Sequence, residues 1–158
     1  MKLFYALSSP FVRKCLVAAQ EIGLRDRIEL IPAAPSPVNR DATVVAHNPL
    51  GKIPTLITAD GLVLYDSRVI CEYLDDLGGG SLLPPAGPAR WSALAEFEHR
   101  SGTLGDRIDI GTITLGCVLG YLDFRYAALA WRDRYPLLAR WFETFGARAS
   151  MRATRPTQ

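Results

Sequence analysis

The 158-residue sequence has few of the side chains that build metal sites or disulfide frameworks. It contains three cysteines, Cys15, Cys71 and Cys117, and two histidines, His47 and His99. The cysteines are odd in number and far apart, no Cys-x-x-Cys pair occurs, and none is spaced with a histidine as zinc ligands are. We therefore expect neither a disulfide framework nor a bound metal.

The three cysteines are better explained as packing residues. Cys15 and Cys117 fall at apolar positions of segments with helical periodicity, which predicts buried core thiols. Cys71 lies one residue away from the apolar stripe of its segment, a position compatible with partial exposure. No residue near Cys71 favours ionisation of its thiol.

The sequence also lacks a strong charge bias and any long apolar run. Its 18 Lys and Arg residues are interspersed with 16 Asp and Glu residues, so nucleic acid is not an expected partner. The N-terminus has one basic residue and an apolar run too short for a signal peptide. No stretch reaches the roughly 20 apolar residues of a membrane span. We therefore expect a cytoplasmic protein that does not enter a membrane.

The overall composition, 49% hydrophobic and 22% charged, is that of a globular protein. A chain of this length can bury a sizeable core, either as one domain or as two small ones. Residues 78–88 are rich in glycine and proline, which predicts a linker. We therefore expect one domain over residues 1–77 and a second over residues 89–158.

The first domain begins with a pattern typical of a βαβ unit. Residues 2–7 form a short apolar run, and Pro10 follows a serine at a position that suits the first turn of a helix. Apolar residues recur at helical spacing over 11–22, and Gly23 is placed to end that helix. A second apolar run over 28–31 then predicts a parallel strand pair with a right-handed crossover.

A loop and a hairpin follow this unit. Residues 32–39 carry three prolines and no periodicity, and a short helical turn is expected over 41–47. Two apolar runs, 55–58 and 62–65, flank a turn in which Gly61 suits a positive φ. With a helix after the hairpin, the order is β-α-β-loop-β-β-α, which is the thioredoxin-like α/β order.

Asp66 and Ser67 stand where the hairpin ends and that helix begins. The apolar spacing over 69–77 predicts the helix, and Ser67 is the expected N-cap. The unpaired N–H groups and positive dipole end of a helix start can hold a carboxylate, and Asp66 can hold an ammonium group. One amino-acid-like head group would satisfy both.

The series Lys52-Ile53-Pro54, hairpin, Asp66-Ser67, helix resembles the glutathione site of the soluble glutathione transferases, in particular bacterial members of the serine type. In that family the proline is cis, the residue before it pairs through its backbone with the cysteinyl part of glutathione, and the acidic-serine pair holds the γ-glutamyl end. The resemblance implies these roles for Pro54, Ile53, Asp66 and Ser67, with Lys52 near the glycyl carboxylate. The simpler alternative makes Pro54 a strand-start proline and Ser67 only a helix cap.

Ser9 stands where transferases with a catalytic serine, such as the plant tau class, keep that residue. The resemblance implies that its hydroxyl donates a hydrogen bond to the glutathione thiolate, while the helix dipole favours the negative charge. Ser8 is the alternative, because Ser-Ser also resembles the zeta-class motif, and Ser9 could be an N-cap alone. No thiol lies in residues 8–12, so dithiol exchange is not expected. Arg13, one turn further, is expected to be a solvated charge, the alternative being a part of the site's electric field.

The second domain has a helical pattern. Residues 89–100 form an amphipathic segment, and Asp106 to Asp109 resemble a capping box that opens an apolar helix over 110–121. A last helix is expected over 136–148. This half resembles the all-α domain of the transferases, but in a truncated form.

The truncation falls inside the amphipathic segment. Residues 89–94 resemble the start of the first long helix of the family's helical domain, and residues 95–100 resemble the end of its second, so several tens of residues are missing between them. In the family these two helices wall the pocket for the electrophile and form much of the dimer interface. The sequence therefore does not decide between monomer and homodimer, and it predicts exposed apolar surface where the helices are absent.

The resemblance implies a glutathione transferase that activates the thiolate of glutathione, its co-substrate, for attack on small electrophiles, as in detoxification. A glutathione-dependent isomerase or peroxidase on the same fold is one alternative. A non-catalytic binding or interaction protein that keeps the fold is the other, and the truncated helical half favours it.

Overall fold

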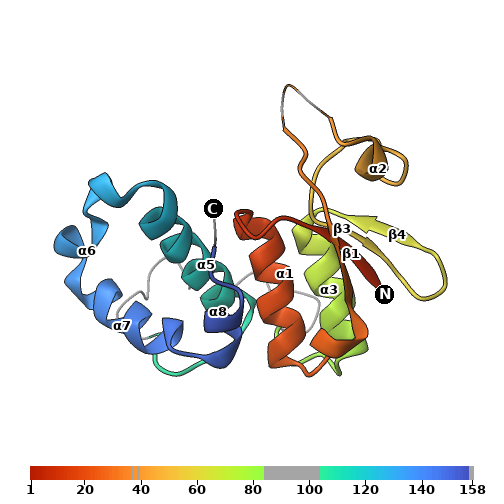
Figure 1. Cartoon of the computed structure of the whole chain (residues 1–158). Coiled ribbons are helices and arrows are strands. Elements are labelled where there is room, and N and C mark those ends of the chain that lie inside the picture. Colours follow the sequence, from red (N-terminus) through yellow and green to blue (C-terminus); the bar gives the residue numbers. More distant parts are fainter. Residues whose placement is uncertain (37, 39, 84–103, 157–158) are drawn as a thin grey trace, which may run out of the picture.

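The structure, a computed structural model, describes residues 1–36, 38, 40–83 and 104–156 (Figure 1). The amphipathic segment predicted over 89–100 lies outside the described residues, as does the second part of the predicted linker. The domain boundaries proposed from the sequence therefore stay predictions.

A four-stranded sheet forms the centre of the first half (Figure 1). Its strands are β1 (Lys2–Tyr5), β2 (Glu29–Pro32), β3 (Thr55–Ile57) and β4 (Val63–Tyr65), in the spatial order β2-β1-β3-β4. Strands β1 and β2 are parallel, whereas β3 is antiparallel to both β1 and β4. The predicted β-α-β-loop-β-β-α order is confirmed, including the hairpin turn, where Gly61 has φ +86°.

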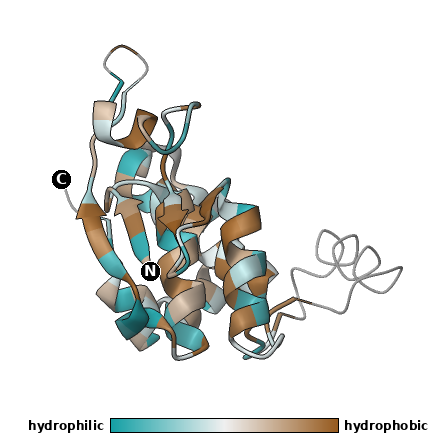
Figure 2. Cartoon of the chain, turned by 90° about the vertical axis from the view of Figure 1, so that its right-hand side faces the viewer, coloured by the Kyte–Doolittle hydropathy of each residue, from teal (hydrophilic) through white to brown (hydrophobic). Residues whose placement is uncertain are grey.

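The alternation of side chains along β1 gives the sheet two packed faces. Leu3 is paired with Leu56 of β3, and both belong to the main hydrophobic core. Phe4 belongs to a smaller cluster, with Ala33, which follows β2, and with Val44, which lies on the short helix α2 (Ala42–Val45). Hydrophobic residues, brown in Figure 2, accordingly run along the strands and the helices beside them.

Helices α1 (Pro10–Glu21) and α3 (Ser67–Leu77) lie side by side against the sheet, and a 3₁₀ turn, η1 (Arg25–Arg27), precedes β2. Every residue of α1 from 12 to 19 is buried, because α1 also packs against helices of the second half. A helix at the surface would bury only one face.

The structure corrects the predicted start of α3. The N-cap is Asp66, whose Oδ1 atom accepts the backbone N–H of Arg68 at 2.8 Å, and Ser67 is the first residue of the helix. Asp66 has φ +68° and ψ 129°, which lies outside the left-handed helical region and is a rare backbone conformation for a residue other than glycine. Because the chain turns at Asp66, Ser67 is carried inward and is 5% exposed.

The second half contains α5 (Ile110–Arg125), α7 (Pro136–Gly146) and α8 (Ala149–Ala153), with η3 (Ala127–Leu129) and α6 (Trp131–Arg134) between α5 and α7. Helix α5 runs four residues beyond the predicted end, and the helix predicted over 136–148 corresponds to α7, which ends two residues earlier. The sequence prediction missed α8, since five residues are too few to show a helical period.

The capping box of α5 lies three residues later than predicted. Asp109 is the N-cap: its Oδ1 atom accepts the N–H of Thr112 at 2.9 Å, and the Thr112 hydroxyl oxygen accepts the N–H of Asp109 at 3.0 Å. Both residues are buried, whereas Asp106 is exposed. Burial removes these two N–H groups from water, and the two hydrogen bonds of the capping box offset the free-energy cost of that desolvation. At an exposed helix start, water would accept these hydrogen bonds.

The two halves share one hydrophobic core. The main cluster joins residues of the sheet, α1 and α3 with residues of α5, α7 and α8, among them Leu16, Ile70, Ile113, Phe145 and Met151. Contacts between α1 and α5 and between α1 and α8 account for this continuity. The second half therefore completes the burial of α1.

All three cysteines are free and buried. The predictions for Cys15 and Cys117 are confirmed, but Cys71 is 1% exposed, so partial exposure was wrong. The reason is that position 71 of α3 faces α1, where the thiols of Cys71 and Cys15 lie 3.9 Å apart. Burial raises the pKa of Cys117 to about 12, as expected for a thiol that serves only packing.

A charged pair joins α1 to the beginning of α8. The Glu21 carboxylate accepts hydrogen bonds from Nε and Nη2 of Arg148, at 3.1 and 2.9 Å, and from the Ser150 hydroxyl. Burial alone would raise the pKa of Glu21, but the hydrogen bonds from Arg148 and Ser150 and the charge of Arg148 outweigh it, so the pKa is lowered.

We predict that Glu21→Gln and Arg148→Ala each lower the free energy of unfolding at neutral pH by about 1 kcal/mol. Because the folded pKa of Glu21 lies below its ordinary value of 4.5, the stabilisation is complete above that value and is lost as the pH falls through the folded pKa. Urea unfolding of both variants and the double variant, at about pH 7 and about pH 3, measures the coupling energy.

Arg152→Ala is the matched control, since Arg152 is an exposed arginine of the same helix with no contact to Glu21 among the described residues. This variant should change stability little at either pH. A coupling energy between Glu21 and Arg148 that is the same at both pH values would contradict the assignment.

Candidate functional site

The strand register brings three loops to one edge of the sheet. Thr55, the first residue of β3, pairs with Phe4 near the end of β1 and with Tyr65 at the end of β4. The end of β1, the start of β3 and the end of β4 therefore meet. The segments that extend from these ends carry Ser8 and Ser9, Ile53 and Pro54, and Asp66 and Ser67.

The Ile53–Pro54 peptide bond is cis, as the resemblance implied. Pro54 is buried, Ile53 is half-buried and Lys52 is exposed. The backbone around these residues thus lies at the surface of the site edge, with the Lys52 ammonium group able to reach solvent or a ligand.

The buried side-chain amide of Asn48 forms hydrogen bonds with the segment that leads to Pro54 and β3. The side-chain nitrogen of Asn48 donates hydrogen bonds to the carbonyl oxygen of Lys52 and to the Thr55 hydroxyl, both at 3.0 Å, and its oxygen accepts the N–H of Leu50 at 3.0 Å. Asn48 is 1% exposed. The sequence analysis gave Asn48 and Thr55 no role, although an asparagine before Pro-Leu-Gly is a signal for this kind of turn.

At the other side of the edge, Asp66 is exposed and Ser67 is buried. One oxygen of the Asp66 carboxylate caps α3, which leaves the second for a ligand. The Ser67 hydroxyl makes no hydrogen bond to the residues that the structure describes. A helix start also offers N–H groups without intrahelical partners. This pair can therefore receive both an ammonium group and a carboxylate.

A buried thiol on α1 forms a hydrogen bond with the backbone of Ser67. The sulfur of Cys15 on α1 lies 3.7 Å from the Ser67 carbonyl oxygen and donates to it. Burial raises the pKa of Cys15 well above its ordinary value, so the thiol keeps the proton that this bond requires. The sequence analysis assigned Cys15 to the core, and the structure adds that this core residue touches the site.

Ser9 is the N-cap of α1: its hydroxyl oxygen accepts the N–H of Val12 at 3.3 Å. The capping prediction for Ser9 is confirmed. Because the oxygen acts as an acceptor in this bond, the O–H proton is still available to a ligand. Ser9 can therefore cap the helix and donate a hydrogen bond at the same time.

Ser8 lines a cavity of about 530 Å³ where the carboxyl ends of the parallel strands β1 and β2 meet. Asp41, the N-cap of α2, forms another part of its wall. Hydrogen bonds from the Thr43 hydroxyl and from backbone N–H groups lower the pKa of Asp41, so this carboxylate stays ionised. Ligands of α/β folds commonly bind beyond the carboxyl ends of parallel strands.

Arg13 corrects the expectation of a solvated charge. It is 4% exposed, and its guanidinium group donates to the carbonyl oxygen of Met151 at 3.0 Å and to the Thr154 hydroxyl at 3.4 Å. Burial lowers its pKa. The reason for the difference is that α8 and the chain after it cover the side of α1 that the sequence pattern left open.

Within the described ranges, no three His, Cys, Asp or Glu side chains lie close enough together to hold a metal ion. In the same ranges, no helix is long and apolar enough to cross a membrane. The Asp66 carboxylate, the start of α3 and the exposed Lys52 are groups that can receive ammonium and carboxylate groups of a ligand.

Both halves of the chain match known protein families. Residues 8–77 match the glutathione S-transferase N-terminal domain, and residues 89–144 match the glutathione S-transferase C-terminal domain. A crystal structure of a glutathione transferase family member from Pseudomonas fluorescens Pf-5, with bound glutathione, is 36% identical, with a TM-score of 0.88. The match covers 99% of each chain.

A second crystal structure from Pseudomonas fluorescens Pf-5, with bound S-(propanoic acid)-glutathione, is 35% identical over the whole of both chains, with a TM-score of 0.83. The GST-like protein YibF of Escherichia coli K12 is 29% identical over an alignment of 203 positions, which covers 99% of this chain and 98% of YibF. Because this chain supplies at most 158 residues, at least 45 of those positions have no counterpart in it.

The matches to both domains, together with the identity over almost the full length of a solved relative, agree with the thioredoxin-like sheet and the helical second half. The chain belongs to the glutathione S-transferase family.

Proposed function

We propose that the protein binds glutathione at the edge of the sheet described above. Asp66 and the start of α3 with Ser67 hold the γ-glutamyl end, the backbone of Ile53 beside Pro54 pairs with the cysteinyl part, and Lys52 attracts the glycyl carboxylate. The observation that carries this proposal is the convergence of these segments through the register of β1, β3 and β4. The glutathione bound in the solved structure of 36% identity and the S-(propanoic acid)-glutathione bound in that of 35% identity support it.

The reaction that this site favours is conjugation of glutathione, through its sulfur atom, to a small electrophile. The Ser9 hydroxyl and the positive end of α1 stabilise the thiolate. The thiolate forms a bond to the electrophilic carbon. In a substitution, the electron pair of the bond that breaks leaves with the leaving group; in an addition, the π electrons of the activated double bond move away from the attacked carbon, and the product then takes up a proton. The S-substituted glutathione in one relative supports this assignment, because such a thioether is the kind of product that the reaction gives.

The electrophile needs space next to the sulfur. The cavity beside Ser8, with a volume of about 530 Å³, provides space at the carboxyl ends of β1 and β2. An isomerase or peroxidase reaction would use the same thiolate and the same space. The activity and a cytoplasmic location stay predictions, and the sequence predicts neither a monomer nor a homodimer.

A second candidate is a glutathione-binding protein without turnover. One observation favours it: YibF has at least 45 aligned positions that this chain lacks. The sequence analysis assigned the missing residues to helices that wall the electrophile pocket in the family. Binding depends on the first half alone, so it can persist without catalysis.

We predict that Ser67→Ala weakens glutathione binding by about 1–3 kcal/mol, because one charged oxygen of the γ-glutamyl head group loses its donor. Calorimetry of the purified chain measures this change. Ser81→Ala, at an exposed position beyond the end of α3, is the control and should bind like the wild type. Absence of glutathione binding by a folded wild-type protein would contradict the proposal.

We predict that Ser9→Ala raises the pKa of the bound glutathione thiol by about one to two units, toward its free value of about 8.5. The thiolate fraction and any conjugation rate then fall at neutral pH and recover as the pH rises above the new pKa. Ultraviolet absorbance of the thiolate, followed against pH, measures the shift.

Ser8→Ala is the matched control and should leave the thiol pKa unchanged. Ser9→Thr keeps both the cap and the hydroxyl, so it should restore most of the effect and separates thiolate stabilisation from the loss of the helix cap. A raised pKa in Ser8→Ala and not in Ser9→Ala would assign the role to Ser8.

A further inference from the structure

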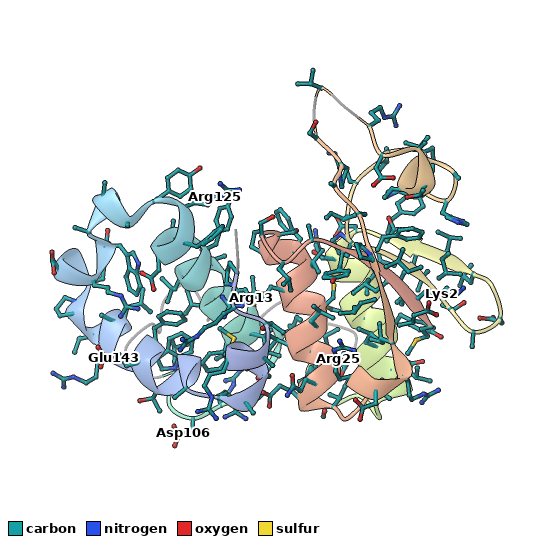
Figure 3. The ribbon with its side chains drawn as sticks, viewed as in Figure 1. Lys2, Arg13, Arg25, Asp106, Arg125 and Glu143 are labelled. Carbon is teal, nitrogen blue, oxygen red and sulfur yellow. The ribbon has the colours of Figure 1, made fainter. Side chains whose placement is uncertain are left out.

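A second cavity lies between α1 and the helices of the second half, and it shares no lining residue with the cavity beside Ser8. It has a volume of about 510 Å³ and is bounded by α1, the end of α5, α6, α7 and the chain that follows α8. Five charged side chains line it: Arg13, Arg132, Arg155, Asp123 and Glu143. Figure 3 shows Arg13 between α1 and the helices of the second half, with Glu143 further out on α7.

Arg13 enters this cavity with part of its hydrogen-bonding capacity unused. Its Nε and Nη2 atoms bind Thr154 and Met151, but its buried Nη1 atom has no partner among the described residues. No carboxylate in the described part of the chain forms an ion pair with it. Burial lowers the pKa of Arg13, and the nearby charge of Arg155 adds to this effect. A guanidinium group buried without a counter-ion is unfavourable, so an anion would stabilise it.

Gly120 makes the room for this nitrogen. A Cβ atom at position 120 would lie 2.2 Å from Nη1 of Arg13, which is far inside contact distance. Glycine inside a helix is less favourable than alanine, so its presence in α5 needs a local reason. The close approach of the Arg13 guanidinium group, at a position that also lines the cavity, supplies that reason.

The remaining charges limit the ligand to one negative charge. Arg132 is neutralised by Asp123: Nη2 lies 2.8 Å from Oδ2, and Nε lies 3.3 Å from Oδ1. Glu143, whose charge also acts on Arg132, is the second carboxylate of the lining, so the five charged side chains leave an excess of one positive charge. A dianion such as phosphate would bring more negative charge than this excess balances.

The apolar part of the wall indicates what the anion is attached to. The rings of Phe124 and Phe142 line the same cavity as the guanidinium groups. A ligand that fills the cavity therefore gains by carrying an apolar or aromatic group next to its negative charge.

We propose that this cavity binds small aromatic monocarboxylates. The carboxylate lies between the guanidinium groups of Arg13 and Arg155, and the ring packs against Phe124 and Phe142. Its lining includes none of the residues assigned to the proposed glutathione site, and the proposal does not rest on that site.

The test is a titration of the full chain with benzoate, followed by NMR or tryptophan fluorescence, with neutral benzamide as the matched ligand. Saturable binding of benzoate, and much weaker binding of benzamide, is expected. Arg155→Gln changes an exposed residue and should weaken benzoate binding about threefold to fivefold. Arg152→Gln removes the same charge from an exposed position of α8 that does not line the cavity, and it should have little effect.

Gly120→Ala displaces the Arg13 nitrogen and should weaken benzoate binding about tenfold or more in a variant whose circular dichroism shows it to be folded. The Arg155 and Arg152 pair decides the proposal even where Gly120→Ala does not fold. Absence of saturable benzoate binding, equal affinity for benzamide, or equal effects of Arg155→Gln and Arg152→Gln would overturn it. Displacement of benzoate by glutathione, without sensitivity to Arg155→Gln, would overturn it too, since benzoate would then occupy the other site.

Discussion

The burial of α1 on all sides is the constraint on which the rest of the structure depends. One side of the helix packs on the sheet and α3, and the other packs on α5 and α8, so residues 12–19 are all inaccessible. A twelve-residue helix therefore joins both halves into one core and carries Ser9 at its first turn. The same burial encloses Arg13, where the Thr154 hydroxyl and the Met151 carbonyl group accept hydrogen bonds from Nε and Nη2, and Nη1 has no partner among the described residues.

At the edge of the sheet, the pairing of a few residues between β1, β3 and β4 determines which loops meet. Because Thr55 pairs with both Phe4 and Tyr65, the end of β1, the start of β3 and the end of β4 lie side by side, whatever the sequence of the loops that extend from them. The local details are then fixed by buried polar contacts, such as the Asn48 amide under the Lys52 carbonyl group and the Cys15 thiol under the Ser67 carbonyl group. Core side chains of this kind position the backbone groups that a ligand would meet.

Different parts of the chain cover α1 and form the edge of the sheet. The elements α5, α7 and α8 are enough to cover α1 and to complete its core, although YibF has at least 45 aligned positions more than this chain. The edge of the sheet is formed by the ends of β1, β3 and β4. Val118 on α5 and Leu137 at the start of α7 are exposed apolar side chains, and an apolar surface left by absent helices stays a prediction.

The sequence by itself determined the order of the strands and helices of the first half, the Gly61 turn and the residues that line up at the edge of the sheet, because periodicity and turn chemistry act over a few residues. Family resemblance supplied the ligand, which periodicity does not encode. Tertiary structure alone decided that Asp66 and not Ser67 caps α3, that Cys71 is buried and that Arg13 is enclosed. The guanidinium group of Arg13 meets the carbonyl group of Met151 across 138 positions of sequence, and no local pattern reports a contact at that separation.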